Sequence, residues 1–89
     1  MAVAVLLEFP GATQQQFDQV AEKVASKSPA GLLYHVEGPI AGGWRVVDVW
    51  ESQEAVDTFF QEALGQALQE AGIAIPQPQF WPVHRILKP

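Results

Sequence analysis

Two segments of this 89-residue chain are typical of β-strands that are apolar on both faces. Residues 2–9 run Ala-Val-Ala-Val-Leu-Leu-Glu-Phe, and residues 44–51 run Trp-Arg-Val-Val-Asp-Val-Trp-Glu. A sheet with one face in water alternates apolar and polar side chains, whereas a sheet that is apolar on both faces is covered on both. These strands therefore predict a sheet with a protein layer on each side.

Two amphipathic helices follow the first and third strands. Thr13 and Gln16 fit a capping box that begins the first helix, and the segment Ser28–Gly31 is expected to end it. Ser52 is expected to cap the second helix, Gly65 to break or bend it, and Gly72 to follow its end. The predicted buried face of the second helix consists of Val56, Phe59, Phe60, Ala63, Ala67 and Ala71.

The remaining segments complete a β-α-β-β-α-β order. Strands are predicted at residues 2–9, 32–37, 44–51 and 79–87, with a flexible connection at 38–43. This order predicts an α+β, ferredoxin-like single domain over residues 1–89, with a four-stranded antiparallel sheet and both helices on one face. The other face needs a partner, and a second copy of the chain packing sheet to sheet is the simplest one. A homodimer is therefore expected.

Charge and composition exclude several classes of function. The formal charge is −5, and the five basic residues are scattered, which argues against binding to nucleic acid or to an anionic membrane surface. There is no cysteine, so disulfides and thiolate metal sites are excluded, and no run is long enough to span a membrane. We expect a cytoplasmic protein without cofactor or metal.

The sequence resembles the antibiotic biosynthesis monooxygenase-type (ABM) family. The resemblance lies in Val49-Trp50-Glu51-Ser52, followed by Glu-Ala and an aromatic pair, in the Pro-Gly turn after the first strand, and in the Pro-Ala-Gly entry to the second. It implies a dimeric α/β barrel. Members of this family include cofactor-free quinol monooxygenases, haem-degrading enzymes, isomerases and lyases.

The resemblance also assigns positions to the pocket. In the quinol-oxidising branch a Trp at the end of the third strand lines the pocket, and Trp50 matches it. The Asn and Tyr of that branch correspond here to Val46 and Val56, so quinol oxidation is disfavoured. Haem-degrading members carry a His on the second helix, which this chain lacks.

If Trp50 faces the interior of the barrel, its alternate neighbours Trp44, Val46 and Asp48 share that side, and the helices cover the other. The hairpin register then selects which residues of the second strand meet them. A turn centred between residues 40 and 41 pairs His35 with Val46. It also pairs Trp44 with Glu37, which is expected to be a solvated rim charge.

A slip of one residue would exchange His35 for Tyr34, which we expect in the helix-side core. We prefer the His35 register because it gathers the polar groups of two strands.

His35, Asp48 and Trp50 form the candidate site. His35 could act as a general base that Asp48 orients, with Trp50 and Trp44 as binding walls for a planar molecule. Alternatively, His35 and Asp48 satisfy each other at a dimer interface. His84 could add a second imidazole to the pocket or lie at the dimer rim, and no ligand spacing supports a metal at these residues.

Two functions follow from these residues. The first is a small cofactor-free enzyme of the ABM type, a monooxygenase or an isomerase or cyclase, acting on an apolar aromatic or polyketide-like molecule. The second is a non-catalytic dimeric barrel that binds a small ligand or is purely structural. A cavity of roughly 300 Å³ or more that reaches His35 would favour a ligand.

Overall fold

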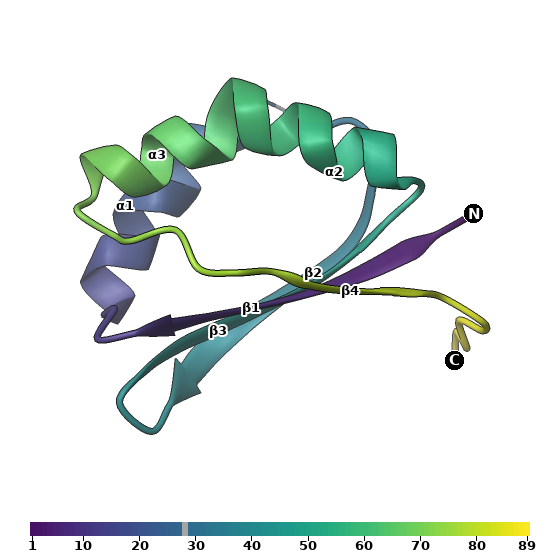
Figure 1. Cartoon of the computed structure of the whole chain (residues 1–89), viewed down its shortest axis with the longest axis horizontal. Helices are drawn as coiled ribbons and strands as arrows, with labels where there is room; N and C mark the ends of the chain where they lie inside the picture. Colours follow the sequence, from purple (N-terminus) through teal and green to yellow (C-terminus); the bar gives the residue numbers. More distant parts are fainter. Residues whose placement is uncertain (28) are drawn as a thin grey trace.

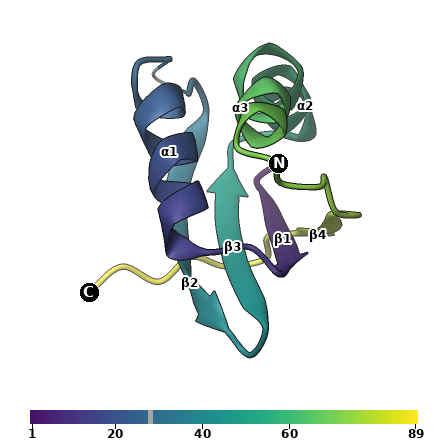
Figure 2. The ribbon, with the colours of Figure 1, turned by 90° about the vertical axis from the view of Figure 1, so that its left-hand side faces the viewer.

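The apolar strands form one four-stranded antiparallel sheet in the computed structural model, which describes residues 1–27 and 29–89. The strand order is β2-β3-β1-β4, and the helices lie together on one face of the sheet (Figures 1 and 2). The α+β, ferredoxin-like order is confirmed. The elements are β1 (Val3–Pro10), α1 (Gln14–Ala25), β2 (Leu32–Ile40), β3 (Gly43–Trp50), α2 (Gln53–Phe59), η1 (Phe60–Leu64), α3 (Gly65–Glu70) and β4 (Gln79–Pro82). Within the described ranges, no helix has the length and apolar character needed to cross a bilayer.

The predicted capping box begins α1. The Thr13 hydroxyl accepts a hydrogen bond from the Gln16 backbone N–H at 3.2 Å, and the Gln16 side chain accepts one from the Thr13 N–H at 3.0 Å. The Gln16 amide also donates to the carbonyl of Ala71 at 3.2 Å, which ties the start of α1 to the end of α3. The helix ends at Ala25, ahead of the predicted stop at residues 28–31. One residue of that predicted stop, Ser28, lies outside the described residues.

The second helix runs continuously from α2 through η1 to α3, and Gly65 does not break it. Its middle is a π-helical segment, in which the Gly65 N–H bonds to the Phe60 carbonyl. A Cβ at Gly65 would lie 3.0 Å from that carbonyl oxygen, so glycine suits the wide turn. The extra residue of a π-turn rotates the following helix. This brings Leu68, which is fully buried and was missed by helical spacing, into the core.

The β2–β3 hairpin is longer than predicted, and its register differs by two residues. β2 continues through Pro39 to Ile40, so most of the expected flexible connection is paired strand. Because β2 is an edge strand, a proline without an N–H is tolerated there. The turn centres on residues 41–42, where Gly42 has φ +74°, and His35 therefore pairs with Asp48 instead of Val46.

The expectation that the Trp50 side of β3 faces away from the helices is wrong. Trp44, Val46, Asp48 and Trp50 are all buried on the helix side, and the three apolar ones pack in the main core with residues of α1 and α2–α3. Tyr34, expected in the helix-side core, lies instead on the open face of the sheet and is 42% exposed. Both faces of β3 are apolar, so the alternation alone did not show which one the helices cover.

β4 is also shorter than predicted, because it ends at Pro82 and not at Leu87. Pro82 pairs with Val3, which is the first residue of β1. Because the two strands are antiparallel, the residues after Pro82 run past the start of β1 and have no strand to pair with. One further bond, from the Val83 N–H to the Ala2 carbonyl, continues the contact. The C-terminal segment then crosses to the far edge of the sheet, where the Lys88 ammonium lies 5.6 Å from the centre of the Tyr34 ring.

Candidate functional site

A chain of hydrogen bonds crosses β2 and β3 on the helix side of the sheet. The indole N–H of Trp50 donates to Asp48 Oδ2 at 3.3 Å, and Asp48 Oδ1 lies 2.6 Å from His35 Nδ1. His35 Nε2 in turn lies 2.6 Å from Glu37 Oε2, and the indole N–H of Trp44 donates to Glu37 Oε1 at 3.3 Å. The imidazole is therefore held between two carboxylates, and each carboxylate also accepts from a tryptophan.

The strand register builds this array. His35 pairs directly with Asp48, and Glu37 pairs with Val46 between Asp48 and Trp44. Alternate residues of a strand share one face, so His35 and Glu37 point to the same side of β2. An irregularity between Leu32 and Tyr34 precedes the array, and the pairing is regular from there on.

The electrostatics of the array favour a protonated His35. The hydrogen bond that the ring donates to Asp48 is the largest influence, and together with Glu37 it outweighs partial burial, so the pKa of His35 rises from 6.5 to about 9. At neutral pH the ring is then an imidazolium whose two N–H groups donate to the carboxylates. Asp48 is only 7% exposed, and a buried carboxylate of this kind is stable only with partners such as these.

Two cavities lie between the sheet and the helices. The first, of about 260 Å³, lies against α1 and is lined by His35, Glu37 and Asp48 among mostly apolar side chains. The second, of about 480 Å³, lies against α2, η1 and residues 75–78. Asp48 and Trp50 line both cavities, but His35 lines only the first, whose volume is slightly below the 300 Å³ expected for a ligand site.

The predicted site residues are thus brought together, on the opposite face of the sheet from the one expected. His35, Asp48 and Trp50 are hydrogen-bonded in series, and Val46 lines the first cavity. Phenylalanines already cover part of the tryptophan surfaces: Trp44 stacks on Phe17 at 5.8 Å between ring centres, and Trp50 packs against Phe59 at 5.1 Å.

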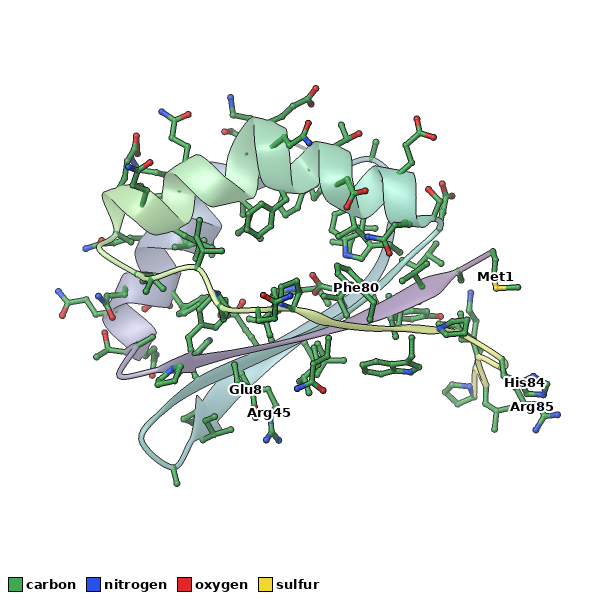
Figure 3. The ribbon with its side chains drawn as sticks, in the orientation of Figure 1. Met1, Glu8, Arg45, Phe80, His84 and Arg85 are labelled. Atoms are coloured by element: carbon green, nitrogen blue, oxygen red, sulfur yellow. The ribbon has the colours of Figure 1, made fainter. Side chains whose placement is uncertain are left out.

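His84 is separated from this group. It is exposed in the C-terminal segment beyond β4 and lines neither cavity (Figure 3). The pocket position, one of the two expected for His84, requires a last strand that extends to Leu87, whereas β4 ends at Pro82.

Glu37 is the residue that the sequence interpretation missed. Expected as a solvated rim charge, it bonds to both His35 and Trp44. The signal was present in the sequence, because residues 35 and 37 of one strand necessarily share a face.

The array is suited to moving or holding a proton at the edge of an apolar cavity. It joins a half-buried imidazole to one carboxylate that is buried and to another that reaches solvent. In the described part of the chain, no three His, Cys, Asp or Glu side chains are grouped to hold a metal ion. The fold and these residues define a ferredoxin-like α+β domain with an ionised histidine between its sheet and its helices.

Solved structures with this fold include ABM-type proteins. A candidate antibiotic biosynthesis monooxygenase from Chloroflexus aurantiacus superposes with a TM-score of 0.67 and 18% identity over 97% of each chain. SnoaB, a cofactor-independent oxygenase from Streptomyces nogalater, gives a TM-score of 0.67 and 13% identity over 97% of this chain and 95% of its own. The resemblance to ABM-type proteins is therefore confirmed at the level of the fold.

A third structure with the same fold is a dimeric ferredoxin-like protein of unknown function from Thermobifida fusca. It gives a TM-score of 0.68 and 15% identity over 93% of this chain and 92% of its own. No family model and no curated protein matches the sequence.

Proposed function

We propose that this chain is a small cofactor-free enzyme of the ABM type that acts on an apolar aromatic or polyketide-like molecule bearing an acidic hydroxyl. The observation that carries the proposal is the Asp48–His35 pair at the edge of an apolar cavity between sheet and helices. The fold shared with a cofactor-independent oxygenase supports it. Trp50 and Val46 form part of the cavity wall, whereas Trp44, predicted as a second wall, lines neither cavity and contacts the site only through Glu37.

In this proposal His35 is the general base and Asp48 orients it. A pKa of about 9 lies near that of a phenol, which is about 10, so a proton can pass between the two with little change in free energy. The imidazolium that results then stabilises the substrate anion. In the oxygenase version this anion reduces dioxygen directly. In the isomerase or cyclase version the same base moves a proton and no oxygen is consumed.

The test compares the wild type with His35→Ala and His84→Ala. Candidate phenols and enols are screened by oxygen uptake and by mass spectrometry of the products. If His35 is the base, His35→Ala abolishes turnover, whereas His84→Ala, at a residue outside both cavities, retains it. Turnover at the wild-type rate in His35→Ala would refute the proposal. The pH profile is a second readout, because the rate should rise with pH up to about 9 as the ring loses its proton.

A non-catalytic role is the second candidate, and one observation favours it: both ring nitrogens of His35 are already bonded to carboxylates. In that case His35→Ala leaves the buried Asp48 carboxylate with only the Trp50 indole as partner and destabilises the fold by about 1–3 kcal/mol. This candidate is supported if His35→Ala is less stable than the wild type and the wild type shows neither ligand binding nor turnover.

We also propose that the chain forms a homodimer through the open face of the sheet. The apolar side chains on that face and the likeness to a dimeric ferredoxin-like protein support this arrangement.

A further inference from the structure

Glu37 is hydrogen-bonded to Nε2 of His35, the nitrogen that would take the proton of a substrate. A ligand must therefore displace Glu37 before it can bond to that nitrogen. Building on the proposed function, we infer that Glu37 is a latch on His35. Its carboxylate is hydrogen-bonded to Nε2 in the free protein, and the acidic hydroxyl of a ligand displaces it from that nitrogen. Glu37 is thereby a positioning residue that also selects the ligand class.

The two carboxylates that hold the ring are not equivalent. Asp48 is buried, with a side chain that is 9% exposed, and its second oxygen accepts from the Trp50 indole. Moving Asp48 would leave a buried carboxylate and a buried N–H without partners, at a cost of about 1–3 kcal/mol for each group. Asp48 therefore stays on Nδ1 and keeps the ring oriented.

Glu37 is the partner that can leave. Its side chain is 26% exposed, and it lies on the edge strand β2. Water can replace the hydrogen bonds of a carboxylate that swings outward from such a position. Its second bond, to the Trp44 indole at 3.3 Å, is longer than the bond to His35 and holds the carboxylate in the capping position.

The charges around the ring define what can take the place of Glu37. Of the described side chains that line the first cavity, the only titratable ones are His35, Glu37 and Asp48. The residues that α1 and η1 contribute are apolar. An imidazolium that loses one carboxylate needs another negative oxygen. A phenol or enol that releases its proton to solvent and binds as its anion supplies one, whereas a hydrocarbon of the same shape does not.

The test uses Glu37→Gln, with Glu8→Gln as the matched control. Glu8 is also a strand carboxylate paired with a cation, Arg45, but it lies on the open face of the sheet (Figure 3). Diethyl pyrocarbonate, which acylates a free neutral imidazole nitrogen, is the first probe. His84, exposed in the same molecule, is the internal standard.

In Glu37→Gln, diethyl pyrocarbonate should acylate His35 about tenfold faster, relative to His84, than in the wild type. The reason is that the loss of one nearby negative charge lowers the pKa of the His35 ring by about one. Glu8→Gln should leave the ratio unchanged. Glu37→Asp, which keeps the charge, should fall between the two. Thermal melts of all variants exclude unfolding as the cause. An unchanged ratio in Glu37→Gln would overturn the inference.

The second probe is 2-naphthol, compared with naphthalene by calorimetry. Removing the latch should tighten 2-naphthol binding severalfold in Glu37→Gln and leave naphthalene binding unchanged. Weaker 2-naphthol binding in that variant would overturn the latch, because Glu37 would then be a direct ligand contact. If 2-naphthol binds to neither protein, the proposed function and the exchange with a phenol both fail, while the acylation ratio still decides whether Glu37 caps His35.

Discussion

His35 lies between two carboxylates, and this arrangement decides which protonation state the ring has in the folded protein. The hydrogen bond to Asp48 raises the pKa of the ring most, and Glu37 adds to the effect. A histidine of this kind is an ionised pair partner at neutral pH, and it becomes a proton acceptor only as the pH approaches 9 or when one carboxylate leaves.

The stability of the fold should therefore fall in alkaline solution. The pKa of His35 is raised from 6.5 to about 9, so its stabilising contribution is complete below pH 6.5 and is lost as the pH rises through 9. The side chain is 40% exposed, and solvent screening reduces the effect to about 1–2 kcal/mol. Urea unfolding at several pH values measures it, and His35→Gln should remove this part of the pH dependence. An equal slope in that variant would contradict the assignment.

Val46 and Val56 are expected to make the protein a poor catalyst of quinol oxidation. Both are buried, one beside each cavity, at positions where the quinol-oxidising branch that the sequence resembles carries polar residues. The protein should oxidise simple naphthoquinols far more slowly than an ordinary enzyme turns over its substrate. Oxygen uptake at about 1 per second or faster would show this to be wrong.

Among the elements, the pairing of β1 with β3 depends on a close backbone approach at Gly43. A Cβ at this position would lie 2.3 Å from the carbonyl oxygen of Phe9, a contact that no side chain can make. Gly43 pairs with Pro10 at the end of β1 and with Ile40 of β2. The glycine thus allows the hairpin to join the sheet beside Trp44, one end of the hydrogen-bonded array.

Gly43→Ala should destabilise the protein by about 2 kcal/mol or more, because the backbone of β1 or β3 must shift. Gly38→Ala is the control: it lies in the same hairpin, has no atom within 4 Å of the added Cβ, and should change stability by less than about 0.5 kcal/mol. Thermal or urea unfolding of both variants provides the measurement. Equal effects of the two substitutions would mean that the close approach is not maintained in solution.

On the scale of the whole molecule, the two faces of the sheet differ in what covers them. The helices cover the face that carries the array, whereas the other face leaves apolar side chains open, including Tyr34, Val36 and Trp81 at 42%, 63% and 45% exposure. The Arg45–Glu8 ion pair lies near one end of this open face. A surface of this kind on a small chain is typical of an interface.

The homodimer prediction is tested by light scattering, which should give twice the 9.7 kDa of the chain. The interface should bury more than about 1,200 Å² in total. Val36→Glu places a charge on the open face at a position that costs the single chain little, and it should yield a monomer. Ile75→Glu, an equally drastic change in the loop on the helix side, should remain dimeric. A wild-type monomer at micromolar concentration would refute the interface.

Local patterns in the sequence determined the order of the elements and the composition of each face. The Thr13–Gln16 capping box and the Ser52 cap depend on contacts three residues apart, so their residue types predict them directly. The alternation of β3 likewise places Trp44, Asp48 and Trp50 together wherever the strand lies, because the period of a strand is a property of its backbone.

Tertiary structure decided which face the helices cover, and therefore where the candidate site lies. Both faces of β3 are apolar, so no local signal distinguished them, and only the packing of α1 and α2–α3 placed Asp48 beneath the helical layer. The register of the hairpin brings His35 opposite Asp48 and Glu37 onto the second ring nitrogen. It depended on a turn centred on residues 41–42, one residue further along the chain than expected. A shift of two residues preserves which side chains share a face and changes only which ones meet, and that distinction is set by contacts between strands and not within them.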